Sequence, residues 1–328
     1  MSLNVKSKLL KKLFEAKGEP VSGQDLADQF GMSRTAIWKH IKDLEKDGYE
    51  IGTVRKKGYY LIETPDLVNE ANIQKYLMAK KYGRRIRYVD SCPSTQPIAL
   101  EEEQNGAPDG MIVVAEEQTA GKGRMMRPWS SASGKGIWMS VICRPHLMPQ
   151  QAPQMTLVAA VAVTRAIEEI TGLEPTIKWP NDLLIDGKKI TGILTELQAD
   201  PDRVKAVILG IGINVNHEES DFPEELQTIA TSLKIASGQQ VNRAQLIAKI
   251  ADYLELYISM YEKSGFEPIK LVWESYSNTI GKRIRAVLLN ETIEGTALGI
   301  SDEGVLELRL DDGSIRGIFS ADIELPKD

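Results

Sequence analysis

The spacing of apolar residues changes along the 328-residue chain, and its first sixty positions follow the pattern of a small helical module. Apolar residues recur at helical spacing over 5–14, and two further helices are predicted over 24–30 and 34–48, each preceded by a serine that can cap it. Two short strand-like runs follow at 49–54 and 59–62. This order predicts a helix-turn-helix followed by a β-hairpin.

Residues 63–66 break the pattern, and we interpret them as a linker. Beyond them, strand-like and helical runs are mixed without strict alternation. Such a pattern favours a mixed or antiparallel sheet with flanking helices over a doubly wound parallel sheet. The predicted strands cover 86–89, 110–115, 136–143, 176–179, 190–197 and 204–213, and a buried helix covers 157–170.

The last fifty residues carry short β-rich runs separated by turns of the Asp-Gly type. Their regular spacing predicts a small barrel or sandwich. The chain is therefore expected to be an α+β multidomain protein, with domains at 1–64, 65–277 and 278–328.

Composition excludes several classes of protein. The richest apolar stretch, 155–164, is too short to span a membrane, and the N-terminus lacks the apolar core of a secretory signal, so we expect a cytoplasmic protein without a membrane segment. Cys92 and Cys143 have no paired spacing and no histidine cluster nearby, which argues against a disulfide framework or a zinc site.

The net charge of −6 is unevenly distributed. Residues 1–62 hold twelve Lys and Arg against eight Asp and Glu, an excess of four, so the remainder carries −10. A basic module on an acidic body is typical of a nucleic-acid-binding domain. The helix-turn-helix with its basic hairpin resembles the winged-helix DNA-binding family over about the first sixty residues, and the hairpin corresponds to the wing. We predict that the third helix and the wing contact DNA through Ser33, Arg34, Thr35, Trp38, Lys39, Arg55, Lys56 and Lys57.

Two other interpretations of this surface stay open. The winged helix can serve protein contacts alone, or its charges can form an ordinary solvated face. Trp38 is equally compatible with packing inward.

The loop over 118–129 combines two glycines, two arginines and a tryptophan. Glycine allows close approach of the backbone to a ligand, Arg124 and Arg127 can grip phosphate oxygens, and Trp129 offers a flat face to an adenine ring. The loop lacks the Gly-Lys-Ser/Thr ending of a P-loop. Taken alone, it is also compatible with an exposed flexible loop.

Two further segments carry polar groups at the ends of predicted strands. Lys178-Trp-Pro-Asn-Asp182 is followed by Lys189 and, on the next strand, by Glu196. Two lysines and two carboxylates on neighbouring strands can stabilise a developing charge and hold Mg²⁺, or form an ordinary ion-pair lattice. The strand over 209–215 contains two glycines and Asn214, which indicates either a closely approaching ligand or a bulge.

The order and spacing of these segments resemble the biotin protein ligase family over essentially the whole chain, and the winged helix in front resembles its bifunctional bacterial members, which are ligase and biotin-operon repressor in one chain. The resemblance rests on Ser94-Thr-Gln96, Gln118-Thr-Ala-Gly-Lys-Gly-Arg124 with Arg127-Pro-Trp129, Lys178-Trp-Pro-Asn-Asp182, Lys189 with Gly192-Ile-Leu-Thr-Glu196, and Gly210-Ile-Gly-Ile-Asn214. It implies a central sheet of the biotin/lipoate ligase type, like class II synthetases, and an SH3-like C-terminal barrel.

The resemblance also implies the reaction and its residues. Enzymes of this family join biotin to ATP as biotinyl-5′-adenylate and pass the biotinyl group to a carrier-domain lysine, with Mg²⁺ on the triphosphate. The catalytic residues would be Arg124, Arg127, Lys178 and Lys189, and Asp182 would help to place Mg²⁺. ATP would contact Arg124, Arg127, Trp129, Asn181 and Asn214. Biotin would contact Ser94, Thr95, Gln96, Gln118, Gly121, Gly123, Arg124, Lys189, Gly192, Gly210 and Gly212.

The implied partners are the biotin carboxyl carrier domain of acetyl-CoA carboxylase, of pyruvate carboxylase or of both, operator DNA of biotin genes, and a second copy of the chain in a ligand-dependent homodimer. The sequence departs from the family pattern at Lys122, where an arginine is usual, and at Gln96 between Pro93 and Pro97, where the family has asparagine.

Three rival interpretations are compatible with the same residues. A lipoate–protein ligase would share the fold and the adenylation chemistry. The chain can also be a ligand-sensing transcription factor whose enzyme-like domain has lost its catalytic activity. The retained charged residues Arg124, Arg127, Lys178, Asp182 and Lys189 argue against that loss. A pure ligase would carry a winged helix that no longer binds DNA.

Overall fold

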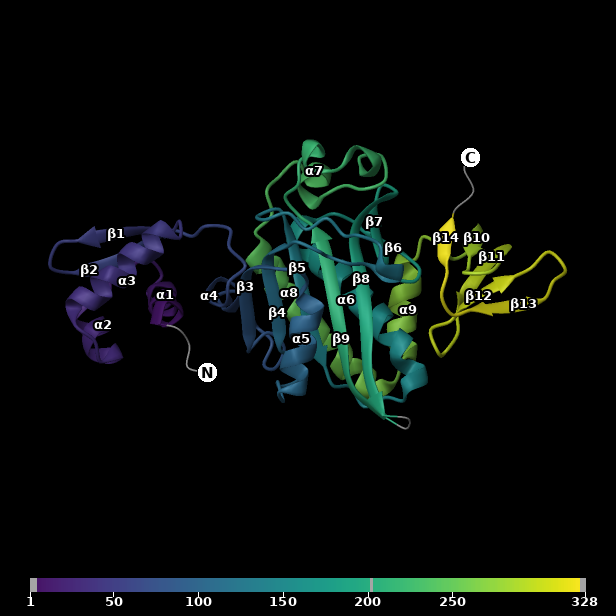
Figure 1. Ribbon diagram of the computed structural model, residues 1–328, viewed down its shortest axis with the longest axis horizontal. Coiled ribbons are helices and arrows are strands. Elements are labelled where there is room, and N and C mark those ends of the chain that lie inside the picture. Colours follow the sequence, from purple (N-terminus) through teal and green to yellow (C-terminus); the bar gives the residue numbers. More distant parts are fainter. Residues whose placement is uncertain (1–4, 201–202, 325–328) are drawn as a thin grey trace.

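The computed structural model describes residues 5–200 and 203–324, and its three parts follow one another along the long axis of the molecule (Figure 1). The helical module with its β-hairpin lies at one end, the large sheet with its helices lies in the middle, and a small β domain lies at the other end. The order predicted from the apolar pattern is confirmed.

The N-terminal domain is a helix-turn-helix with a hairpin wing. Its elements are α1 (Val5–Glu15), α2 (Gly23–Phe30), α3 (Arg34–Lys46), β1 (Glu50–Val54) and β2 (Gly58–Glu63). The predicted serine caps are confirmed: the Ser22 hydroxyl accepts a hydrogen bond from the Gln24 amide at 3.2 Å, and the Ser33 hydroxyl accepts one from the Ala36 amide at 3.1 Å. The three helices enclose a core of their own, which includes Leu9, Leu13, Ile37, Ile41 and Leu44.

The central domain is built on one seven-stranded mixed sheet with the order β3-β4-β5-β9-β8-β7-β6. Only β3 and β4 run parallel, and every other neighbouring pair is antiparallel. The strands are β3 (Ile86–Cys92), β4 (Ile112–Gln118), β5 (Gly136–Cys143), β6 (Thr176–Lys178), β7 (Asp182–Ile185), β8 (Lys188–Asp200) and β9 (Arg203–Asn214).

Helices cover both faces of this sheet. Alternate strand residues point to opposite sides, so Val113 and Ile208 pack with Ala99 of α5 (Thr95–Gln104), while Val114 and Leu209 pack into the larger core on the other face. That larger core holds α6 (Ala152–Thr171), α8 (Arg243–Ser264) and α9 (Glu267–Tyr276). Short helices α4 (Glu70–Gln74) and α7 (Leu233–Ser237) and 3₁₀ turns at Arg124–Met126, Pro149–Gln151, Glu219–Asp221 and Glu224–Leu226 complete the domain.

The C-terminal domain is a five-stranded antiparallel sheet with the order β13-β12-β11-β10-β14. Its strands are β10 (Arg283–Val287), β11 (Thr292–Ile300), β12 (Leu306–Arg309), β13 (Ile315–Ile318) and β14 (Asp322–Glu324). Gly304 and Gly313, both with left-handed φ angles, occupy the predicted turns. Ile284 and Leu306 join the same apolar core as Trp273 of α9, so this domain is packed directly onto the central one.

Two strands were not predicted, β7 and β14, and both are four residues or shorter.

Within the described ranges, no helix is long and apolar enough to cross a bilayer.

Candidate active site

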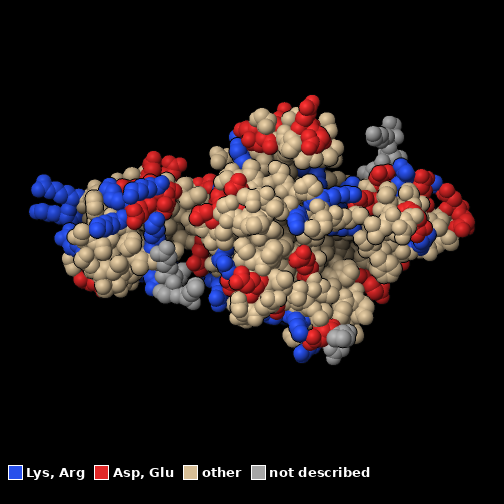
Figure 2. Space-filling view, viewed as in Figure 1, with Lys and Arg blue, Asp and Glu red and all other residues tan. Residues whose placement is uncertain are grey.

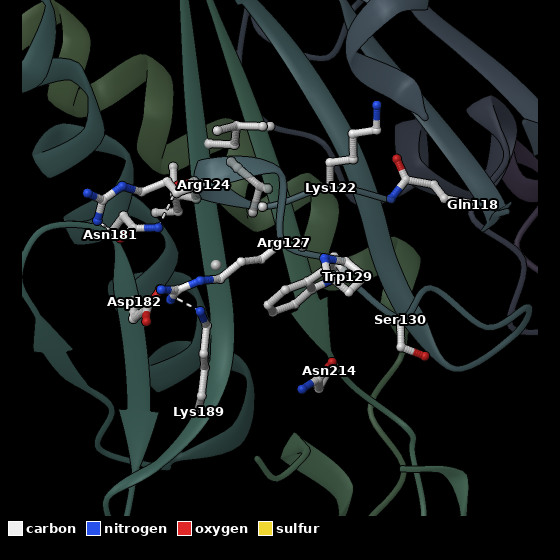
Figure 3. Close-up of a pocket in the computed structure, with 18 of the residues that line it drawn as sticks. Gln118, Lys122, Arg124, Arg127, Trp129, Ser130, Asn181, Asp182, Lys189 and Asn214 are labelled. Carbon is white, nitrogen blue, oxygen red and sulfur yellow. Dashed lines mark hydrogen bonds and ion pairs between the residues drawn. The ribbon is translucent and has the colours of Figure 1, made fainter. Parts of the chain in front are cut away.

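A cavity of about 300 Å³ lies where the 118–129 loop crosses the sheet (Figure 3). The structure brings together most of the residues that the sequence singled out. They are Ser94, Thr95, Gln96, Gln118, Gly123, Arg124, Arg127, Trp129, Asn181, Asp182, Lys189, Gly192, Gly210, Gly212 and Asn214.

Two predicted residues, Gly121 and Lys178, do not line the cavity. A Cβ atom at Gly121 would lie 2.6 Å from the carbonyl oxygen of Trp129, so this glycine allows the loop to pack against itself. Lys178 ends β6 opposite Asp182 in the sheet register, but in the described part of the chain it makes no ion pair, and we assign it no direct contact with a ligand.

One end of the cavity carries neutral hydrogen-bonding groups. The Gln118 side-chain oxygen accepts from the Thr95 amide at 2.9 Å and its amide nitrogen donates to the Ser131 hydroxyl at 3.0 Å. The Thr95 and Ser140 hydroxyls lie 2.7 Å apart. Ser94 caps α5. The prolines at 93 and 97 are accommodated because α5 begins only at Thr95. This end suits an uncharged polar group that needs both donors and acceptors.

Arg124 is held from two domains at once. Its guanidinium donates to the Asn181 side-chain oxygen at 3.0 Å and to the Ser320 hydroxyl at 2.7 Å. Burial lowers the pKa of Arg124, and the charge of Arg127 lowers it further, whereas Asp322 and Asp182 oppose that effect. A partly desolvated arginine with donors facing a cavity is a strong site for an anion.

Arg127 is more exposed and forms an ion pair with Asp322 on β14, 195 residues away. Asp322 lines the cavity, so the C-terminal domain supplies part of its wall. Both arginines of the 118–129 loop thus contact side chains of the C-terminal domain.

Lys189 faces the same space from β8. Its ammonium nitrogen lies 2.7 Å from an Asp182 carboxylate oxygen and 5.2 Å from the centre of the Trp129 ring (Figure 3). With Arg124 and Arg127 it brings three cations to one cavity.

The metal prediction rests on Asp182 alone. The described residues contain no group of three or more His, Cys, Asp or Glu side chains arranged to hold a metal ion. Magnesium usually takes one or two carboxylates and completes its shell with water and substrate phosphates, so Asp182 fits only as a single ligand beside a phosphate.

The strand glycines make room for side chains of the pocket itself. An added Cβ at Gly212 would lie 2.6 Å from the Trp129 indole nitrogen, and one at Gly192 would lie 3.0 Å from the same ring. An added Cβ at Gly210 would lie 3.0 Å from Gln96. The close approach expected at these glycines is confirmed, but the groups that approach them are the side chains of Trp129 and Gln96.

Several lining residues were not predicted. They are Lys122, Pro128, Ser130, Met139, His217, Phe222, Leu226, Ile229, Ala230 and Asp322, with Ile193, Leu194 and Ile211 of the strands. His217 is 2% exposed and stacks on Phe222 with ring centres 5.0 Å apart, and burial lowers its pKa to about 4, so it is neutral at pH 7. The stretch 216–230 after β9 is mostly polar and acidic, with apolar residues only at scattered positions, so it carries no distinctive signal of a site in the sequence.

The predicted DNA-contacting residues all lie on the outside of the N-terminal domain. Ser33, Arg34, Thr35 and Lys39 are exposed on α3, and Trp38 is 49% exposed, so it does not pack inward. Arg55, Lys56 and Lys57 form the exposed turn between β1 and β2. Figure 2 shows Lys and Arg side chains gathered at this outer end of the molecule.

The fold and the site define a class of protein. It is an enzyme domain whose basic loop, 118–129, is suited to binding a nucleotide, joined to a winged helix. Family models agree with each part. Residues 88–214 match the biotin/lipoate A/B protein ligase family, residues 5–60 match an HTH domain, and residues 279–325 match the biotin protein ligase C-terminal domain. These ranges fall within the predicted domains 1–64, 65–277 and 278–328, whose boundaries stay a prediction.

Whole-chain relatives narrow the class further. The chain is 51% identical over 325 residues to the bifunctional ligase/repressor BirA of Bacillus subtilis, covering 99% of this chain and all of that one. It is 30% identical to BirA of Escherichia coli, covering 94% of each. Biotin protein ligase from Aquifex aeolicus, solved with biotin and ATP, superposes with a TM-score of 0.63 at 29% identity, covering 75% of this chain and all of the other. The chain belongs to the biotin protein ligase family, among the members with an N-terminal helix-turn-helix domain.

Proposed function

We propose that this chain activates biotin with ATP, transfers the biotinyl group to a lysine of carrier domains of acetyl-CoA carboxylase, pyruvate carboxylase or both, and represses biotin genes when the adenylate is bound. The observation that carries the enzymatic part is the meeting of Arg124, Arg127 and Lys189 at one cavity whose other end, around Thr95 and Gln118, offers neutral donors and acceptors. That combination fits a ligand with a ureido head, an apolar body and a carboxylate tail.

In the first step, a biotin carboxylate oxygen bonds to the α-phosphorus of ATP and pyrophosphate leaves with the electrons of the broken P–O bond. Two anions must meet, so the cations supply the stabilisation. We assign the carboxylate and α-phosphate to Lys189, Arg124 and Arg127, and the adenine to Trp129 with Asn214 nearby; Asn181 is a further ATP contact. Mg²⁺ bound to phosphate oxygens beside Asp182 would neutralise the triphosphate.

In the second step, the amine of an acceptor lysine attacks the biotinyl carbonyl, an amide forms, and AMP leaves with the electrons of the C–O bond. The acceptor lysine is itself the nucleophile, so the chain needs none of its own. The backbone of Gly123 and the side chains of Ser94, Gln96 and Gln118 would hold the ring system meanwhile.

Mass spectrometry of a carrier domain incubated with the protein, biotin, ATP and Mg²⁺ tests the activity. We expect one added biotinyl group on one lysine. In the Lys189→Met variant the rate of biotinylation should fall by a factor of about 10²–10³, since a cation at the developing charge is removed. The matched control is Lys188→Met, because Lys188 does not line the cavity and its ammonium donates to the Gln227 backbone carbonyl at 3.4 Å.

Arg124→Gly should release the adenylate and allow labelling of many lysines, because its phosphate clamp is gone. Unchanged selectivity would refute the clamp. Titration calorimetry with biotin and with lipoate shows which of the two acids the site binds. Binding of lipoate alone would overturn the choice of biotin.

For repression, we propose that the adenylate strengthens a homodimer through the central domain and brings two winged helices to two half-sites of an operator in the cytoplasm. The exposed residues of α3 and the basic wing support this. A gel shift on biotin-operon DNA should be stimulated by biotin plus ATP, and its absence would leave the chain a ligase alone.

A further inference from the structure

The segment between the winged helix and the central sheet is anchored by buried polar groups on both of its sides. Because 63–66 breaks the apolar pattern, the sequence indicates a plain linker there. In the structure, the Asp66 carboxylate accepts from the Arg243 backbone amide at 3.0 Å and from the Arg243 guanidinium at 2.8 Å. The Arg243 guanidinium also donates to the Asp66 backbone carbonyl.

Arg243 is the centre of this anchor and is only 1% exposed. Its guanidinium contacts Glu116 of β4 at 2.7 Å and donates to the Gly136 carbonyl of β5 at 3.2 Å. Burial pulls the pKa of Arg243 down, but the charges of Asp66 and Glu116 outweigh burial and raise it above its ordinary value. A buried cation needs its counterions, so Asp66 is fixed rather than loosely placed.

A second buried side chain grips Asp66 from the end of the sheet. The Asn216 amide nitrogen donates to the Asp66 carboxylate at 3.1 Å and to the Val241 carbonyl at 2.9 Å, while its oxygen accepts from the Val241 amide at 3.0 Å. Asp66 is therefore tied to β4 and β5 through Arg243, and to the chain just beyond β9 through Asn216.

The other side of the segment is tied to the winged helix. The Tyr49 hydroxyl, at the end of the helix-turn-helix, donates to Asn72 at 3.0 Å and accepts from Asn69 at 2.8 Å. Asn72 in turn donates to the carbonyls of Pro65 and Leu67 at 3.3 and 3.0 Å. In α4, Ala71 packs in the core of the N-terminal domain and Ile73 packs in the core of the central domain.

We infer that Asp66 and Tyr49 are positioning residues that fix the angle of the winged helix on the central domain, and that this fixed angle sets which spacing between two DNA half-sites a dimer of the chain accepts. The inference rests on the proposed function for its DNA consequence. The joint itself stands on the contacts above.

Spacing is a sharp readout because each base pair added between two half-sites turns one of them by about 35° around the duplex. A rigid joint cannot follow that rotation, so only one spacing allows both winged helices to bind. A loose joint accepts several. A change in the strength of each half-site contact, by contrast, would weaken all spacings equally.

The first experiment uses a half-site that the wild-type protein selects from a randomised duplex pool in the presence of biotin and ATP. Synthetic duplexes then carry two inverted copies at spacers varied by one base pair. We expect the wild type to bind its best spacer about 100-fold more tightly than spacers two base pairs longer or shorter, because only there do both modules engage. In Asp66→Asn this ratio should fall below about tenfold.

Matched variants keep the result interpretable. Asp47→Asn makes the same change inside the N-terminal domain, where Asp47 pairs with Lys6 of that domain, and should keep the wild-type ratio. Asp66 does not line the cavity, so biotin-dependent pyrophosphate release should stay within about twofold of wild type, which shows that Asp66→Asn is folded. If it does not fold, Tyr49→Phe, which removes one hydroxyl, decides the question.

A second measurement needs neither DNA nor a dimer. Spin labels at Glu19, in the N-terminal domain, and at Leu256, on α8, report the distance between the two domains in the full chain; both positions are exposed. We expect a narrow distance distribution in the wild type and in Asp47→Asn, and a broad one in Asp66→Asn and Tyr49→Phe.

The inference is overturned if Asp66→Asn and Tyr49→Phe keep both the wild-type spacing ratio and the narrow distribution. If the wild type itself binds no paired half-site, the proposed repressor function fails, and the spin-label distances still decide whether the joint is rigid.

Discussion

The two outer domains are attached to the central domain by opposite chemistry. At the N-terminal joint, the central cation Arg243 is 1% exposed and binds carboxylates that no ligand competes for. At the C-terminal joint, the side chain of Arg127 is 64% exposed, and its partner Asp322 lines the cavity where phosphates are expected. The first joint suits a fixed geometry. The second suits contacts that a substrate can exchange.

The largest effect should follow from removing the cation of the N-terminal joint. Arg243→Met leaves Asp66 and Glu116 facing each other without their counterion, and we expect the free energy of unfolding to fall by about 3–5 kcal/mol. Urea denaturation followed by circular dichroism measures it. The control is Arg283→Met, which removes an arginine that also bridges two carboxylates, Asp311 and Glu294, but at the surface. Comparable losses in the two variants would erase the distinction between buried and exposed pairs.

Acid should have the next largest effect, through the buried His217 that lines the cavity. The folded pKa of His217 is about 4 because the ring is buried. An unfolded histidine titrates near 6.5, so its stabilising contribution is complete above that pH and is lost as the pH falls towards 4, by about 1.4 kcal/mol per pH unit at most.

The variant His217→Phe keeps a ring against Phe222 but cannot titrate, so its stability should vary less between pH 6.5 and 5. Thermal unfolding at several pH values measures the difference. The control variant is His146→Gln, at a histidine whose side chain is exposed. Parallel profiles for the wild type and His217→Phe would contradict this prediction.

At the C-terminal joint, Asp322→Ala should affect substrate affinity more than stability. Without its carboxylate partner, Arg127 must be ordered by the nucleotide itself, and we expect the KM for ATP to rise by about threefold to tenfold. The KM for biotin should change less than about twofold, because only the phosphate end is disturbed. Steady-state pyrophosphate release measures both. A lower KM for ATP would show instead that Asp322 competes with the triphosphate.

The smallest effect is expected from Ser320→Ala. Arg124 keeps Asn181 as an acceptor when the Ser320 hydroxyl is lost, so the KM for ATP should rise by less than about threefold. The same assay measures it, and Ser301→Ala, at a serine that caps a local turn of the C-terminal domain, is the control. An effect larger than that of Asp322→Ala would reverse the ranking of the two contacts.

Local patterns predicted the order of the three domains, the N-terminal helices and most strands, but only α6 among the helices of the central domain. The caps Ser22 and Ser33, the helices of the N-terminal domain and the mixed character of the sheet all depend on residues close in sequence, and all are confirmed. Strand β7 was missed because its four residues lie between Pro180 and the Asp186-Gly187 turn and show no alternation long enough to recognise.

Long-range charge pairs were beyond the reach of the sequence. Asp66 and Arg243 are 177 residues apart, and Arg127 and Asp322 are 195 apart, so no spacing rule connects them. The glycines of β8 and β9 show a related limit. Their sequence position indicated that something approaches closely, but only the structure shows that Trp129 lies over Gly192 and Gly212. Most of the predicted site residues meet at one cavity, while Lys178 and Gly121 do not line it.

The shared helix α4 has a practical consequence for exchanging modules between proteins. Ala71 completes one core and Ile73, two residues later, completes another. In a chimaera that joins the winged helix of another protein to residues 65–328 of this chain, that winged helix would have to pack against Ala71 and bond to Asn72, which evolved with a different partner. Transplanting the winged helix therefore requires carrying 65–74 with it and adapting the residues around Arg243 in the host, since residues on both sides of the cut form the joint.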